Sequence, residues 1–228
     1  MMMFPLDSSI ILVIIAMLFA GAAQLRVKST FARYSQVGAR RGVTADRVAR
    51  MLLDRYGLTS VEVKRVGGQL TDHYDPRDRS LALSDSVYGN NSIAAIGVAA
   101  HEVGHAIQHN TGYSPLAIRN TIVPVAGIGS TMAPWIFIAG FAMQGPVLMD
   151  IGILLFVGVV AFHLITLPVE FNASSRAVAI LGQAGILQGE ELDGATRVLN
   201  AAALTYIAAT VVAAMHLARF LILRNSRD

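Results

Sequence analysis

The stretch VLMDIGILLFVGVVAFHLITL, residues 147–167, decides the fold class of this chain. It is apolar and long enough to cross a bilayer as a helix, which takes about 20 residues. Three further stretches meet the same criterion, at about residues 8–25, 121–143 and 201–223. The chain is 54% hydrophobic and 14% charged, whereas a soluble domain is about a quarter charged. We therefore predict a mainly α-helical membrane protein with about four transmembrane helices.

The first apolar stretch has the charge order of a membrane anchor rather than of a signal peptide. The residues before it contain no Lys or Arg, only Asp7, whereas Arg26 and Lys28 follow it. A signal peptide carries its positive charge before the apolar run. The order predicts an uncleaved anchor whose N-terminus lies outside.

The distribution of positive charge predicts the topology. Of the 18 Lys and Arg residues, 13 lie between Arg26 and Arg119, and the turn at 144–146 has none. The positive-inside rule therefore places residues 26–119 in the cytoplasm and the turn outside. A fourth span would carry Arg219, Arg224 and Arg227 outward, against the rule, so the orientation of the last segment stays open. We expect a multi-pass protein of the cell (inner) membrane.

The polar part of the chain has the pattern of a small α+β domain. The pattern predicts one helix from Thr44 to Gly57 and another from Ser92 to about His109, with strands at 61–66 and 80–84. The predicted segments are a membrane anchor at 1–25, a cytoplasmic domain at 26–119, a transmembrane hairpin at 120–168, a cytoplasmic segment at 169–199 and a C-terminal transmembrane helix at 200–228.

The strongest chemical signal is His101-Glu102-Val103-Gly104-His105, inside the predicted helix. Residues four apart lie on one helical face, so both imidazoles can reach a single ion. Catalytic zinc sites take three protein ligands and keep one position for water, and Glu102 is placed to act as general base. The chain has no cysteine, which excludes thiolate ligands and disulfides. The alternative is a helix with two hydrogen-bonded histidines.

Glu170 is the candidate for the third ligand. Two predicted spans separate it from His105, and an even number of spans returns the chain to the same side of the membrane. A carboxylate just beyond a membrane helix is costly unless it is paired or binds a metal. The alternative is a helix-capping residue at the interface. A rival ligand is Asp193, because its Leu-Asp-Gly context resembles a motif of intramembrane proteases. In those proteases the histidine helix is itself a membrane span. In this chain the apolar run Ile93–Ala100 is too short to cross a membrane.

Several motifs together resemble one family. They are LTDHYDP (70–76), LSDSVY (83–88), AAHEVGHAIQH (99–109), LPVEF (167–171) and LNAAALTY (199–206). In this order they are similar to the YugP-type family of bacterial membrane zinc metallopeptidases, and the resemblance covers most of the chain. It implies a neutral zinc peptidase with a zincin-like domain. The chain is also similar to membrane peptidases related to the heat-shock protease HtpX, in which Glu-x-x-Ala-Asp follows the zinc helix; Glu170 matches the ligand there, and Ser174 replaces the Asp.

Other polar residues are secondary candidates. His109 lies one turn beyond His105 and is a candidate to support one of the metal-binding side chains without binding the metal itself. His73 and Tyr74 are candidates to stabilise an oxyanion, with turn residues as the alternative. Arg176 is a candidate to hold Glu170 or a substrate carbonyl, with a surface arginine as the alternative. The basic residues expected to contact anionic lipid headgroups are Arg26, Lys28, Arg33, Arg40 and Arg41.

These patterns predict a zinc-dependent membrane endopeptidase that binds Zn²⁺ and cleaves polypeptides at the cytoplasmic face. A substrate strand could pair with residues 79–84. The alternative is a non-catalytic membrane scaffold or adaptor with a structural zinc site. Metal transport is a third hypothesis, disfavoured because His163 and His216 have no acidic neighbours in their apolar segments. No nucleic-acid motif is present, and the sequence does not specify the substrate or the oligomeric state.

Overall fold

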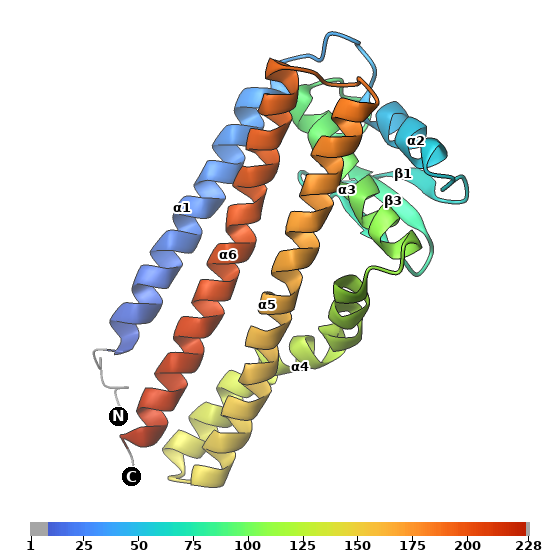
Figure 1. The fold of residues 1–228 in the computed structure, drawn as a ribbon. Helices are drawn as coiled ribbons and strands as arrows, with labels where there is room; N and C mark the ends of the chain where they lie inside the picture. Colours follow the sequence, from blue (N-terminus) through green and yellow to red (C-terminus); the bar gives the residue numbers. More distant parts are fainter. Residues whose placement is uncertain (1–8, 227–228) are drawn as a thin grey trace. The chain divides into compact units, whose positions relative to one another are not determined.

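The computed structural model describes residues 9–226, which are mainly helical, as predicted. In chain order they form α1 (Ser9–Ser35), α2 (Ala45–Arg55), β1 (Glu62–Val66), β2 (His73–Asp75), β3 (Ser80–Ser84), α3 (Ile93–Asn110), α4 (Ser114–Ala142), α5 (Pro146–Gln183) and α6 (Glu190–Asn225) (Figure 1). Four of these helices, α1, α4, α5 and α6, are long and apolar enough to cross a membrane, so the predicted number of spans is confirmed at the level of length and composition. The predicted start of the first span at Ser8, together with Asp7 and Arg227, lies outside the described residues.

Helix α5 continues beyond the predicted end of the third span at about Leu167, and it does not stop before Pro168. The helix continues through this proline to Gln183. A proline inside a helix removes one hydrogen bond and costs about 3 kcal/mol. Val169, Ala173 and Ala177 then lie on a fully buried face of the same helix, and their burial offsets part of that cost. Glu170 is therefore a mid-helix residue rather than one beyond a helix end.

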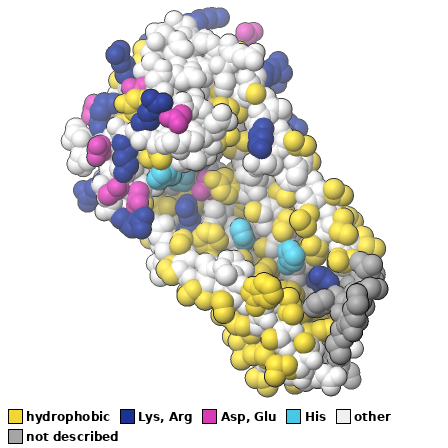
Figure 2. Space-filling model, turned by 180° about the vertical axis from the view of Figure 1, so that it is seen from behind, with side chains coloured by type: hydrophobic (Ala, Val, Ile, Leu, Met, Phe, Trp, Pro, Cys, Tyr) yellow, Lys and Arg dark blue, Asp and Glu magenta, His cyan; other side chains and the backbone are white. Residues whose placement is uncertain are grey.

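The chain divides into two compact units, each of which is described by itself. The apolar unit consists of Met1–Gln24, Ile118–Pro168 and Thr205–Asp228, as far as these are described. Its core stacks Phe137 on Phe220, with ring centroids 4.3 Å apart. Arg224 donates to Asp150 over 2.9 Å, so the C-terminal end of α6 lies beside the N-terminal end of α5. Hydrophobic side chains gather over the lower part of the space-filling view, where few charged side chains are seen (Figure 2).

The polar unit consists of Leu25–Ala117 and Val169–Leu204. Its three strands form a sheet in the order β1-β3-β2, with β1 parallel and β2 antiparallel to β3. Strand β2 was not predicted; its residues had the composition of a turn. The expected pairing of a substrate with residues 79–84 is wrong, because β3 is the central strand and is paired on both sides. The free edges of the sheet belong to β1 and β2.

Helix α3 runs through the core of the polar unit. Its first turn is capped by the Ser92 side chain, which accepts the Ala95 N–H over 3.2 Å, and Gly112 follows its end with a φ of +63°. Most of α3 is buried, and the neighbouring α2 presents an apolar face with helical spacing. The buried residues of that face are Ala45, Val48, Ala49, Leu52 and Leu53. This packing fixes the helix that carries the histidine pair.

Candidate metal centre

Two histidines of α3 and one carboxylate of α5 converge within the polar unit. The His101 and His105 ring centroids are 4.7 Å apart, with their planes nearly perpendicular. Glu170 Oε2 lies 3.2 Å from His101 Nε2 and 3.5 Å from His105 Nε2. One ligand atom from each of the three side chains lies within 4.8 Å of the others. The structure therefore brings the three predicted ligands together.

The close approach of α3 and α5 depends on Gly104, between the two histidines. A Cβ atom at this position would lie 2.6 Å from the Ala173 carbonyl oxygen and 3.2 Å from the Ala173 Cα. Both are backbone atoms, which cannot rotate away as a side chain can. The missing side chain of Gly104 thus lets α5 come near enough for Glu170 to reach the histidines.

Gln108 fixes the orientation of His105. Its Oε1 lies 2.9 Å from His105 Nδ1, and its Nε2 donates to the Val169 carbonyl oxygen over 2.8 Å and to Asn172 Oδ1 over 3.0 Å. A backbone carbonyl only accepts, so the amide NH₂ of Gln108 faces α5 and its oxygen faces His105. The proton of His105 therefore sits on Nδ1, which leaves the Nε2 lone pair directed to the side of Glu170.

Ser174 contacts His101 in the same way. Its Oγ lies 3.1 Å from His101 Nδ1, one helical turn after Glu170. The sequence resemblance to the HtpX-related enzymes predicts an Asp at this position, and the shorter, neutral hydroxyl of Ser174 still meets the histidine. Both imidazoles are thus held at Nδ1 by neutral partners, with Nε2 on the common side.

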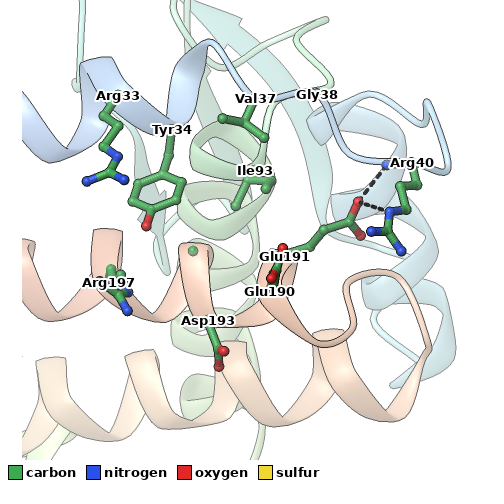
Figure 3. Close-up of a pocket in the computed structure, with 11 residues that line it drawn as sticks. Arg33, Tyr34, Val37, Gly38, Arg40, Ile93, Glu190, Glu191, Asp193 and Arg197 are labelled. Atoms are coloured by element: carbon green, nitrogen blue, oxygen red, sulfur yellow. Dashed lines mark hydrogen bonds and ion pairs between the residues drawn. The ribbon is translucent and has the colours of Figure 1, made fainter.

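The donor set fits zinc. Two imidazole nitrogens and one carboxylate oxygen are a ligand set found in catalytic zinc sites. In residues 9–226 the group that could hold an ion has these three members, which matches the three protein ligands of a catalytic site rather than the four of a structural site. Asp193 is not in the group; it lines a separate pocket that contains none of the three residues (Figure 3).

Glu102 and His105 have shifted acidities because they are buried and close together. Glu102 is 7% exposed, and burial raises the pKa of its carboxyl although His101 and His105 oppose the shift. Burial alone would lower the pKa of His105, but its contact with Glu170 and the charge of Glu102 outweigh burial and raise it. Glu102 is therefore a carboxyl group that accepts a proton more readily than an exposed one.

The secondary candidates differ in how they are linked to the metal centre. Tyr74 Oη on β2 lies 2.9 Å from His109 Nδ1 on α3, and burial raises the pKa of Tyr74, so its hydroxyl stays protonated. His73 Nδ1 lies 2.9 Å from Thr71 O, and within the described part of the chain no hydrogen bond joins it to the three converging residues. Arg176 Nε donates to Asn172 Oδ1 over 2.8 Å, so it reaches His105 only through Asn172 and Gln108.

Gln108 and Asn172 are the residues that the sequence analysis missed. Gln108 is completely buried. The available signal was its spacing: it follows His105 by three residues and therefore lies on the same face of α3. Asn172 has one partner on its own helix, Arg176, but its link to the metal centre runs through Gln108 on another helix, and no local signal indicates that link.

Comparison with known proteins assigns the family. The family model described as "Putative neutral zinc metallopeptidase" matches residues 9–225. The chain belongs to this family. A relative from Bacillus subtilis (strain 168), "Putative membrane protease YugP", is 49% identical over 207 residues, which cover 90% of this chain and 92% of the relative. No solved structure matches the chain. For a member of this zinc metallopeptidase family, the histidine pair with Glu170 is the group suited to hold zinc.

Proposed function

We propose that this protein is an integral membrane zinc endopeptidase that hydrolyses polypeptide or membrane-protein substrates at the cytoplasmic face. The observation that carries the proposal is the convergence of His101 and His105 on α3 with Glu170 on α5. Membership in a zinc metallopeptidase family and the name of the 49%-identical relative support the reaction class.

His101 and His105, each through Nε2, and the Glu170 carboxylate would hold the ion. Zinc at such a site supplies Lewis acidity, which lowers the pKa of water and polarises a carbonyl group. Gln108 and Ser174 keep the two Nε2 atoms turned toward the common side, so the chain is prepared for the ion before it binds.

Glu102 is the proposed general base. Its carboxylate takes one proton from the attacking water and later gives that proton to the amine as the peptide C–N bond breaks, while the remaining O–H completes the new carboxyl group. The raised pKa of Glu102 favours holding the proton between these two events. Glu102 is 7% exposed, which keeps bulk water from competing for the transferred proton.

Tyr74 and His109 are proposed to donate to the carbonyl oxygen as it becomes negative. Positions 101, 105 and 109 follow one another at one-turn spacing on α3, and the Tyr74 hydroxyl is held at the last of them. His73, on the same short strand, is the alternative donor. Arg176 is proposed to act only by positioning Asn172.

The proposed topology places both termini outside and segments 26–119 and 169–199 in the cytoplasm. The basic residues of 26–119 and the uncharged turn before α5 support it. The contact of Arg224 with Asp150 supports an outside C-terminus, because it brings the end of α6 to the start of α5, next to that turn. Pairing with Asp150 also reduces the cost of a positive charge on the outer side.

The proposal separates the roles of two acidic residues. In the purified full-length protein, Glu102→Gln should retain one zinc per chain and lower the cleavage rate of an unfolded labelled polypeptide by about 10²–10⁴-fold. Glu170→Ala should lower zinc affinity by more than about 100-fold, because the loss of a residue that only hydrogen-bonds a ligand already lowers metal affinity about 10–100-fold. Zinc content and cleavage are measured together.

Glu190→Gln, which changes an exposed acid of α6, is the matched control and should leave both quantities unchanged. Cleavage by Glu102→Gln at the wild-type rate would refute the mechanism. A wild-type protein that binds zinc tightly but cleaves no polypeptide would favour the scaffold or adaptor alternative.

Tyr74→Phe tests the proposed donor. Removing the hydroxyl should lower kcat about 10²–10³-fold and leave KM and zinc content nearly unchanged, because the interaction forms as charge develops. Tyr113→Phe, beyond the end of α3, is the control. A change in KM alone would mean that Tyr74 only binds substrate.

A further inference from the structure

A groove lined by arginines runs between α1 and α6 in the polar unit and contains no residue of the metal centre. Its volume is about 630 Å³. Each helix contributes positions spaced i, i+3, i+4 and i+7, which is one face over two turns. The lining residues are Arg26, Ser29, Thr30, Arg33, Tyr34, Arg197, Asn200, Ala201 and Leu204. We call it the arginine groove.

The lining of the arginine groove carries positive charge and no negative charge. Arg26, Arg33 and Arg197 line it, and no Asp or Glu does. Among residues 9–226 none of these three arginines forms an ion pair; Arg33 lies over the Tyr34 ring, with its guanidinium carbon 5.6 Å from the ring centroid. Thr30 adds a hydroxyl group to the lining, whereas the Ser29 hydroxyl donates to the Arg26 carbonyl oxygen over 3.1 Å. Such a lining fits an anionic group that accepts several hydrogen bonds.

An acidic pocket next to the groove shows on which side the anion would lie. This second pocket, of about 450 Å³, shares Arg33, Tyr34 and Arg197 with the groove, but it is also lined by Glu190, Glu191 and Asp193 (Figure 3). Carboxylates repel an anion there. Arg26 lines only the groove, so an anion would lie on the side of Arg26.

Tyr34 marks the boundary between the two spaces. Its ring packs where α6 has Gly194: a Cβ atom at that position would lie 2.8 Å from Tyr34 Cε1. The close contact holds α1 and α6 together at the end of the groove that carries Arg33 and Arg197. The other end carries Arg26 and Leu204.

The groove begins where the apolar part of both helices ends. Leu25, directly before Arg26, is 70% exposed and closes the apolar run of α1, and the apolar part of α6 continues after Leu204. In the sequence of both helices, the arginines of the groove thus border a run of mainly apolar residues. A ligand with an anionic head and an apolar tail matches this order, whereas a soluble anion would use only the head end.

We propose that the arginine groove binds the headgroup of an anionic glycerophospholipid. The phosphate oxygens accept hydrogen bonds from Arg26, Arg33 and Arg197, and the acyl chains leave the groove at the end that carries Leu204. Basic pockets between membrane helices on the cytoplasmic side bind such headgroups in general. The proposal is independent of the peptidase reaction.

The test measures lipid binding by the full-length protein, purified in a neutral detergent, with native mass spectrometry. Phosphatidylglycerol is the anionic probe and phosphatidylcholine, which has the same phosphate but no net charge, is the neutral one. The double variant Arg26→Gln/Arg197→Gln removes one arginine from each helix. The control Arg47→Gln/Arg55→Gln removes two exposed arginines of α2, so the change in net charge is the same.

The groove variant should weaken phosphatidylglycerol binding about 25-fold, from about fivefold per arginine, and the control should change it less than about twofold. Equal losses in the two variants, or none in either, would overturn the proposal, since binding would then be unspecific. Competition by sn-glycerol 3-phosphate as strong as that by the lipid would also overturn it, in favour of a site for a soluble phosphate. Wild-type preference for phosphatidylcholine would refute the anionic class.

Discussion

Helices α3 and α5 contribute to one centre by different physical means. On α3, His101 and His105 are one turn apart, so helix geometry alone sets their relation. On α5, Glu170 reaches them only because two helices approach closely at Gly104 and Ala173. The histidine pair is therefore a local property of the sequence, whereas the complete ligand set is a property of packing. The two parts should fail separately when they are perturbed.

Gly104→Ala should break the packing and spare the histidine helix. The added methyl would lie 2.6 Å from a backbone oxygen of α5, so the helices must separate. Overpacking of this kind costs about 1–3 kcal/mol in stability, and displacement of Glu170 should lower zinc affinity by about 100-fold. Zinc affinity is measured by competition with a chromophoric chelator, and stability by thermal unfolding in detergent.

Gly97→Ala is the matched control on the same helix. A Cβ there would lie 3.4 Å from the Ala195 Cβ, which is ordinary van der Waals contact. We expect little change in zinc affinity and, because Ala favours helix over Gly, unchanged or higher stability. If Gly104→Ala bound zinc as tightly as Gly97→Ala does, the approach of α3 to α5 would not limit the site.

The same contrast explains what the sequence predicts. The four apolar helices and α3 follow from local signals: long apolar runs, the cap at Ser92 and the glycine at 112. The histidine pair follows from a spacing of four. Glu170 could be predicted as a ligand only from the number of intervening spans and from the resemblance of its surrounding motif. Nothing near it in the sequence specifies its partners.

The features that the sequence did not predict all depend on distant contacts. Strand β2 has three residues with turn composition, and it exists because His73–Asp75 pair with β3. Helix α5 passes through Pro168 because the residues after it are buried against the rest of the polar unit. The link from Gln108 to Val169 and Asn172 joins two helices that are far apart in the sequence.

Gln108→Leu tests the link between the two helices, because Gln108 belongs to α3 but is hydrogen-bonded to α5. Leucine has a similar size, yet it removes the hydrogen bond to His105 Nδ1 and the side-chain donor to the Val169 carbonyl. We expect zinc affinity to fall about 10–100-fold while the helix content by circular dichroism is unchanged. Asn110→Leu, an exposed polar-to-apolar change at the end of α3, should have no such effect. Equal affinities for the two variants would show that His105 is oriented by helix packing alone.

Ser174 gives the smallest expected effect and tests α5 from the opposite direction. Ser174→Ala removes one neutral hydrogen bond to His101, worth about 1 kcal/mol, so zinc affinity should fall about fivefold. Ser174→Asp should instead tighten zinc binding, because a carboxylate at this position makes the imidazole more basic. Chelator competition on the two variants measures both changes. If both substitutions lowered the zinc affinity equally, Ser174 would serve helix packing rather than the orientation of His101. If Ser174→Asp tightened zinc binding and Ser174→Ala did not, the position would accept either a hydroxyl or a carboxylate. The charge of this partner on α5 would then set the strength of His101 as a ligand.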